Sequence, residues 1–342
     1  MNDRGYIVVT DYIKANTGED VSDALQELIF ANPHRTIFFP DGEYVIAKPI
    51  LTSATPENSV DLQLSNYATI KAAEGWDSDE AMIRLGAAEP SRGTFRNGSN
   101  YSLTGGIIDG NGVAKGVSIE SGRETRIDRV SIKHTSVGLH LKKGANSNSA
   151  DADIFNVNII GNYKIGSIGL LIESSDNSFT NMRIGGVQIG VKIVQGASAQ
   201  IMKNLHVLYG FGGELDSDEA FRDSIGFYDL VGYMNWYTNC YSDQFATGYY
   251  MINGARHTYT DCYCYWYTDR GGKQHGFHVD GKFNAVIRNS YVKCKDTATD
   301  KAYLVEKQEG GKGVIFAPIA CVSNMTDKTH EKYVVGPGLD WM

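Results

Sequence analysis

Residues 226–281, GFYDLVGYMNWYTNCYSDQFATGYYMINGARHTYTDCYCYWYTDRGGKQHGFHVDG, decide the fold because they repeat two short phrases. The first phrase is a glycine followed by an apolar or aromatic run, and it stands at Gly226–Leu230, Gly248–Ile252 and Gly276–Val279. The second phrase alternates in the same style, and it stands at Asn239–Asp243 and Asp261–Tyr265. A phrase that returns at intervals of about 20 to 50 residues is typical of a repeat protein.

Both phrases recur upstream. The glycine phrase begins at Gly116, Gly138, Gly169 and Gly190, and the second phrase begins at Arg129, Asn156, Asn181 and Asn204 and, downstream, at Asn289. Successive glycine phrases from Gly116 to Gly276 start 21 to 36 residues apart. The shortest steps leave room for two or three short strands with tight turns. Such strands, stacked in parallel, form a β-helix whose inward side chains fill one continuous core.

The alternation within each phrase predicts which side chains point inward. The residues directly after the glycines should form one buried column: Val117, Leu139, Leu170, Val191, Phe227, Tyr249 and Phe277. We expect the glycine itself to occupy a turn with positive φ. The Asn or Asp that opens the second phrase should close a turn by bonding to nearby backbone amides.

The N-terminal part of the chain predicts a strand, a helix and a further pair of strands. Residues 6–12 read as a strand, and Val21–Ala31 has apolar residues at helical spacing. Thr36–Ile46 then reads as a strand, a Pro-Asp-Gly turn and another strand.

This opening resembles that of the pectate-lyase-like β-helix superfamily. The match is carried by Asp11-Tyr12, by the helix over Asp23–Ile29 and by Phe39-Pro-Asp-Gly-Glu-Tyr44, whereas the loop Ile13–Gly18 departs from the acidic, glycine-rich loop of the family. The resemblance implies a right-handed parallel β-helix that is capped by the short N-terminal helix. It does not select a reaction, since the superfamily includes lyases, glycoside hydrolases, epimerases, transglycosylases and phage tailspikes.

The repeats predict one all-β domain over residues 1–342. Residues 1–50 form the N-terminal strand and capping helix, 60–308 the coils, and 309–342 a closing segment. The net charge of −8 and the lack of a basic run argue against a nucleic-acid partner. Residues 1–12 show no apolar core of a signal peptide, and no run is apolar enough to span a membrane. We therefore expect a protein of the cytoplasm or of a virion.

The five cysteines do not suggest a metal site. Cys240 and Cys262 take the same inward slot of successive coils, where free cysteine usually behaves as a small core residue. Cys262 and Cys264 lack the spacing of zinc ligands. We expect no cofactor, with calcium needed only if the chemistry is that of a lyase.

Functional side chains must stand on outward positions. Two outward columns follow from the second phrase. One runs through Arg183, His206, Tyr241, Tyr263 and Tyr291, and its neighbour runs through Leu208, Asp243, Tyr265 and Lys293. Coils about 4.8 Å apart make residues of one column true neighbours. Aromatic residues are dense between residues 226 and 294, which indicates a binding surface.

Aromatic rings with charged groups between them suit a sugar, because rings stack on its apolar face and polar groups bind its hydroxyls. The candidate substrate-binding residues are Trp236, Tyr241, Tyr263, Tyr265, Trp266, Arg256 and Arg288. The same composition also suits a subunit interface. The two uses can coincide, and we expect a homotrimer.

Carboxylates decide whether this surface is catalytic, since glycoside hydrolysis uses a pair of them. Asp243 is the first candidate, with Asp269 or Asp229 as its partner. His278 with Asp280 is a second candidate pair, in which histidine serves as acid or base.

Two hypotheses for the function follow. The first is an enzyme that cleaves or rearranges glycosidic bonds by carboxylate acid/base chemistry: a glycoside hydrolase, a transglycosylase or a polysaccharide lyase. The second is a glycan-binding or structural β-helix module without catalysis, as in a phage tail fibre or tailspike.

Overall fold

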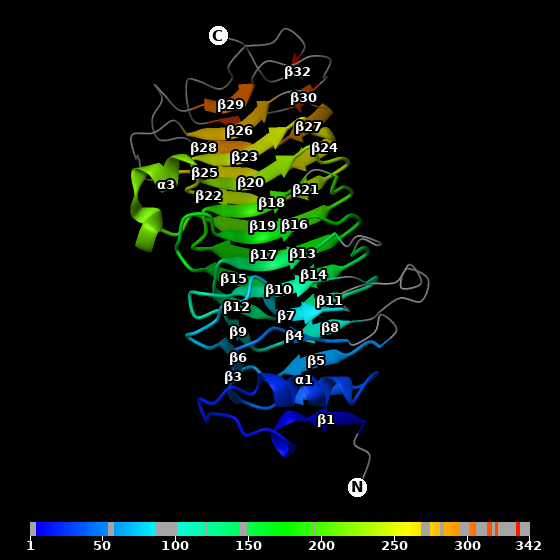
Figure 1. The fold of residues 1–342 in the computed structure, drawn as a ribbon. Coiled ribbons are helices and arrows are strands. Elements are labelled where there is room, and N and C mark those ends of the chain that lie inside the picture. Colours follow the sequence, from blue (N-terminus) through cyan, green and yellow to red (C-terminus); the bar gives the residue numbers. More distant parts are fainter. Residues whose placement is uncertain are drawn as a thin grey trace. The chain divides into compact units, whose positions relative to one another are not determined.

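The computed structural model describes residues 5–53, 58–86, 101–120, 122–143, 149–194, 196–267, 274–280, 284–293, 301–305, 313–316, 319–320 and 333–335. These residues form two compact units. The first comprises residues 1–162 and 173–178, and the second comprises residues 163–172 and 179–342. Each unit is built of short parallel strands (Figure 1).

The first unit begins with β1 (Tyr6–Val8), the 3-10 helix η1 (Val9–Asp11) and α1 (Ser22–Phe30). Its further strands are β2 (Thr36–Phe39), β3 (Gly42–Ile46), β4 (Ile50–Leu51), β5 (Asp61–Leu64), β6 (Ala68–Ala72), β7 (Ala81–Leu85), β8 (Ser102–Thr104), β9 (Ile107–Asp109), β10 (Lys115–Ile119), β11 (Arg126–Asp128), β12 (Ser131–Thr135), β13 (Val137–Leu141), β14 (Asp153–Phe155) and β15 (Asn158–Gly161). They pair in parallel as three stacks: β1-β2-β5-β8-β11-β14, β3-β6-β9-β12-β15 and β4-β7-β10-β13.

The second unit is also built of parallel stacks of short strands. Its elements are β16 (Ile168–Ile172), β17 (Ser178–Gly185), β18 (Ile189–Ile193), β19 (Ile201–Leu208), η2 (Gly213–Asp216), α3 (Asp218–Arg222), β20 (Ile225–Leu230), β21 (Trp236–Thr238), β22 (Tyr241–Asp243), β23 (Thr247–Ile252), β24 (Ala255–Thr260), β25 (Tyr263–Tyr265), β26 (His275–Asp280), β27 (Asn284–Arg288), β28 (Tyr291–Lys293), β29 (Lys301–Val305), β30 (Gly313–Phe316), β31 (Ile319–Ala320) and β32 (Tyr333–Val335).

Three parallel stacks of this unit matter for the site. The β20 stack is β16-β18-β20-β23-β26-β29. The β21 stack runs from the first half of β19 through β21, β24, β27, β30 and β32. The β22 stack runs from the second half of β19 through β22, β25, β28 and β31. The predicted all-β, right-handed parallel β-helix is thereby confirmed.

The predicted inward column is also confirmed. In the first unit Val117 pairs with Leu139. In the second, Leu170, Val191, Phe227, Tyr249 and Phe277 pair in sequence, and all seven side chains are buried. The rings of Phe227 and Tyr249 stack at 4.7 Å between centroids, and those of Tyr249 and Phe277 at 4.6 Å. Helix α1 buries Leu25, Leu28 and Ile29, the apolar face that the sequence predicted.

The glycines of the first phrase have a different role from the predicted one. They lie inside strands rather than in turns of positive φ. A Cβ added at Gly226 would lie 2.6 Å from the carbonyl oxygen of Gly248 and 2.2 Å from the Ser242 hydroxyl. A Cβ at Gly190 would lie 2.5 Å from the Gly226 carbonyl oxygen. These glycines therefore allow the close approach of successive coils.

The asparagines of the second phrase have positive φ, although Asn181 and Asn204 lie within β17 and β19 and only Asn239 follows the end of a strand. Asn181, Asn204 and Asn239 have φ values of 55°, 57° and 52°. The Asn204 amide donates to Asn181 Oδ1 at 2.7 Å, and the Asn239 amide donates to Asn204 Oδ1 at 3.4 Å. An asparagine ladder thus closes the corner between the β21 and β22 stacks.

Asn204→Ala should lower the free energy of unfolding by about 1–3 kcal/mol, because alanine is strained at this φ and the ladder loses a hydrogen-bonding member. Because glycine tolerates positive φ, Asn204→Gly should lower the free energy of unfolding less than Asn204→Ala does. Denaturant midpoints of the two variants check the order. An alanine variant as stable as the glycine variant would rule out the φ requirement.

Candidate functional site

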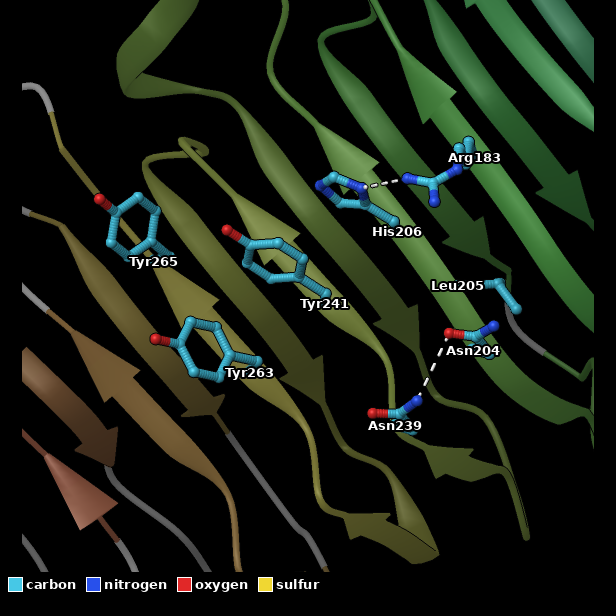
Figure 2. Close-up of a pocket in the computed structure, with 8 residues that line it drawn as sticks. All are labelled: Arg183, Asn204, Leu205, His206, Asn239, Tyr241, Tyr263 and Tyr265. Atoms are coloured by element: carbon cyan, nitrogen blue, oxygen red, sulfur yellow. Dashed lines mark hydrogen bonds between the residues drawn. The ribbon is translucent and has the colours of Figure 1, made fainter.

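An open groove of about 490 Å³ lies on the outer face of the second unit (Figure 2). It extends from the asparagine ladder onto the β22 stack. Its lining residues are Arg183, Asn204, Leu205, His206, Asn239, Tyr241, Tyr263 and Tyr265. Three of the candidate substrate-binding residues, Tyr241, Tyr263 and Tyr265, thus line one groove.

Strand register sets the order of the side chains along this groove. His206 pairs with Tyr241, Tyr241 with Tyr263, and Tyr263 with Tyr291. In the neighbouring column Leu208, Asp243, Tyr265 and Lys293 pair in the same order. Both columns in these strands are the predicted ones.

The rings do not form one unbroken stack. His206 and Tyr241 are parallel at 4.5 Å, and Tyr263 and Tyr291 are stacked at 4.6 Å. Between these pairs, Tyr241 and Tyr263 meet at 88°. The perpendicular contact between Tyr241 and Tyr263 therefore interrupts the stack within the groove.

Asp243 lies beside these rings, with its side chain 14% exposed. Its Oδ1 accepts a hydrogen bond of 3.0 Å from the Gln244 side-chain amide. Its Oδ2 lies 3.6 Å from His206 Nε2. Burial, and after it the Asp243 carboxylate with which the hydroxyl is hydrogen-bonded, raise the pKa of Tyr241 above its ordinary value. The phenol therefore keeps its proton at neutral pH and serves as a hydrogen-bond donor.

Arg183 and His206 are groove residues that the sequence analysis placed in the outward column without assigning them to the site. Arg183 Nη1 lies 3.2 Å from His206 Nδ1. A dashed line marks this contact in Figure 2. His206 lies one coil before Tyr241 in the outward column, and Arg183 lies two coils before it. This position was the signal that could have assigned them to the site. Their contact depends on side-chain conformation, which the repeat pattern does not give.

His278 and Asp280 lie on a different stack from Asp243. His278 stacks on Tyr250 at 4.2 Å, and Asp280 pairs with Ile252, all within the β20 stack. The structure therefore does not bring this pair to the groove. Asp269 lies outside the described residues.

Asp229 does not stand on the outer face, which corrects its placement among the catalytic candidates. It is 1% exposed, because alternation from the inward Phe227 points it into the core as well. The Asn235 amide and the Tyr237 hydroxyl donate to Oδ2 at 2.8 and 3.0 Å, and the Gly232 N–H donates to Oδ1 at 3.0 Å. Asp229 organises a buried polar cluster rather than a surface site.

Trp266 is likewise a core residue and not a surface platform. Its side chain is 1% exposed, and its indole N–H donates to the Phe245 carbonyl oxygen. The dense aromatic tract is in fact divided between core and surface. Tyr237, Phe245, Tyr249 and Tyr259 also point inward.

The remaining candidates lie beyond the groove lining. Trp236 is 38% exposed on β21, and it pairs with Ile201 and Thr258. The Arg256 guanidinium lies 5.3 Å from the centre of the Tyr233 ring. Arg288 is exposed on β27. These three residues belong to the β21 stack, across the asparagine corner from Asp243.

In the part of the chain that the structure describes, no group of three or more His, Cys, Asp or Glu side chains is placed to hold a metal ion. Of the described helices, none is long and apolar enough to cross a membrane.

No family model and no curated protein sequence matches the chain. Solved structures do resemble it. ORF18 of Geobacillus virus E2 is 12% identical with a TM-score of 0.55 over 96% of this chain, which spans only 62% of that protein. The exopolygalacturonase of Thermotoga maritima is 12% identical with a TM-score of 0.54, over 98% of this chain and 90% of the enzyme. The A-module of the Azotobacter vinelandii mannuronan C-5 epimerase AlgE4 is 12% identical with a TM-score of 0.51, over 96% of this chain and 99% of the module. The parallel stacks and these likenesses together identify the fold of the chain as a right-handed parallel β-helix.

Proposed function

We propose that the protein binds a poly- or oligosaccharide along the groove of the β22 stack and cleaves or rearranges its glycosidic bonds. The observation that carries the proposal is the Asp243 carboxylate, which lies beside an open groove lined by Tyr241, Tyr263 and Tyr265. A groove of this kind suits an extended chain better than a small enclosed ligand.

The ring arrangement supports a sugar as the ligand. Tyr241, Tyr263 and Tyr265 line the groove, and their amphipathic rings can pack on the apolar face of a sugar while their hydroxyls form hydrogen bonds. Asn204 and Asn239 add hydrogen-bonding groups along the same groove. Two of the similar structures are enzymes named for a polysaccharide, an exopolygalacturonase and a mannuronan C-5 epimerase.

Asp243 is the proposed acid or base. Its neighbours His206 and Tyr241 both carry exchangeable protons, so the site has three groups able to donate or accept one. Hydrolysis with two carboxylates about 5–9.5 Å apart would need a partner for Asp243. Asp243 reaches the groove through its contacts with the lining residues His206 and Tyr241, and Asp269 stays a candidate partner. Elimination or rearrangement by proton transfer needs no second carboxylate.

A non-catalytic glycan-binding module is the second candidate function. The likeness to a viral protein, ORF18, favours it. This second candidate function includes association of the protein with a virion. The homotrimer also stays a prediction, for which light scattering at micromolar concentration should give three times the mass of the chain.

A panel of polysaccharides and oligosaccharides, incubated with the protein and analysed by mass, tests the proposal. An unsaturated product would mean elimination, a product with water added would mean hydrolysis, and a cyclic product of unchanged mass would mean transglycosylation. Binding without any product would favour the non-catalytic module. Tyr263→Ala should weaken binding, whereas Tyr67→Ala, at an exposed tyrosine of the first unit, should not.

A further inference from the structure

The contact between Arg183 and His206 fixes which ring nitrogen carries the proton. A guanidinium only donates hydrogen bonds, so His206 Nδ1, 3.2 Å from Arg183 Nη1, must accept with its lone pair. The proton of the neutral imidazole then resides on Nε2. The hydrogen bond at one ring nitrogen thus sets the role of the other.

His206 Nε2 is aimed at the carboxylate. The atom is buried, and it lies 3.6 Å from Asp243 Oδ2, slightly beyond hydrogen-bond length. Oδ1 of the same carboxylate is already occupied by the Gln244 amide. The imidazole is held flat against Tyr241, at 4.5 Å and 10° between planes. A shift of less than about 1 Å would close the gap to Oδ2.

We infer that Arg183 and His206 are positioning residues for Asp243. Arg183 holds His206 in the tautomer with the proton on Nε2, and His206 then fixes Oδ2 as Gln244 fixes Oδ1. This inference rests on the proposed role of Asp243. Hydrogen bonds of catalytic groups are often long in the free enzyme and shorten when substrate is bound, which fits the 3.6 Å separation. A ligand that moves the Tyr241 ring would also move the His206 imidazole that is stacked on it.

Two matched pairs of variants separate this role from simple packing. His206→Gln places an amide N–H near the position of Nε2, whereas the shorter side chain of His206→Asn reaches only toward Arg183. Both remove the ring that stacks on Tyr241. Arg183→Lys keeps a donor, and Arg183→Met keeps a long stem without one. Arg183 is exposed and the His206 side chain is 29% exposed, and denaturant midpoints will verify that all four variants fold.

Turnover on the substrate found in the panel gives the kinetic readout. His206→Gln should retain far more activity than His206→Asn, and Arg183→Met should lose more than Arg183→Lys. The larger losses should approach about 10²-fold, the effect of a reacting group misplaced by about 1 Å. They should appear in kcat with KM little changed. Equal losses in the two His206 variants, or losses confined to KM, would overturn the inference.

The tautomer is measured separately from activity. Long-range ¹H–¹⁵N correlation spectra of the wild-type protein, with the His206 signals assigned from the His206→Gln variant, should show a protonated Nε2 and a lone-pair Nδ1. Arg183→Met should introduce the other tautomer. Protonation at Nδ1 in the wild-type protein would refute the inference even if turnover is normal. A wild-type protein with the expected tautomer but no product from any glycan would refute the proposed function instead.

Discussion

Asp243→Asn should lower turnover by about 10²–10⁴-fold on the polysaccharide that the wild-type protein converts, which is the contribution of a general acid or base. Glycan affinity and the fold should persist. The amide has nearly the same shape as the carboxylate, and the rings of the groove, Tyr241, Tyr263 and Tyr265, are unchanged. Initial rates and binding isotherms measured on the same preparation check both parts.

Asp280→Asn is the matched control for this prediction. Asp280 is partly exposed at the end of β26 in the β20 stack, away from the groove strands. We expect its turnover to stay near that of the wild-type protein. If Asp280→Asn were inactive and Asp243→Asn active, His278 and Asp280 would replace Asp243 as the catalytic pair.

Asp229→Ala should lower the free energy of unfolding by about 3–5 kcal/mol, the range for breaking a buried polar pair. The substitution leaves the donors of Asn235, Tyr237 and Gly232 without their shared acceptor. It also removes the carboxylate that lies 3.6 Å from the buried His257 Nε2. Denaturant midpoints measure the loss. Asp280→Ala, at a partly exposed position on the same stack, should change them little. A loss no greater than that of the control would show that the buried cluster is dispensable.

His257 makes the stability of this region sensitive to acid. Burial lowers its pKa from the ordinary value of 6.5, although Asp229 opposes the shift. Since the unfolded chain binds this proton more readily, the stabilisation is present above about pH 6.5 and is lost as the pH falls below it. The window lies above that of Asp20, Glu120 and Glu173, whose pKa values are lowered by hydrogen bonds and neighbouring cations. Between pH 7 and pH 5 the denaturant midpoint of the wild-type protein should therefore fall. The midpoint of His257→Gln should fall less over the same range. Parallel curves for the two proteins would assign the sensitivity to another group.

The coil register could be predicted from sequence because inward and outward positions alternate in the same way in every copy of the two phrases. The same in-and-out alternation also gives the correct placement of two residues that were wrongly assigned to the surface. Asp229 is two residues after the inward Phe227, and Trp266 is two residues after the inward Cys264, so alternation points both into the core. Their polar or amphipathic character suggested the surface. Inside the coil, Asn235, Tyr237 and the Phe245 carbonyl oxygen satisfy them.

Other features depend on contacts between coils that a repeat pattern does not encode. The role of Gly226 follows from the nearness of the Gly248 carbonyl oxygen, and it is invisible within either phrase alone. The relation of Arg183 to His206 depends on the conformation of two long side chains. The outward column correctly predicted that His206 precedes Tyr241, but it could not show that Nε2 faces Asp243.

A crystal structure of the Asp243→Asn protein with a bound oligosaccharide tests the central claim most directly. The proposal predicts a sugar ring against the Tyr241 and Tyr263 side chains. It also predicts a reacting atom within about 2.6–3.2 Å of the substituted side chain at position 243. An oligosaccharide bound instead over Tyr228, Tyr250 and His278 of the β20 stack, with the groove empty, would contradict it.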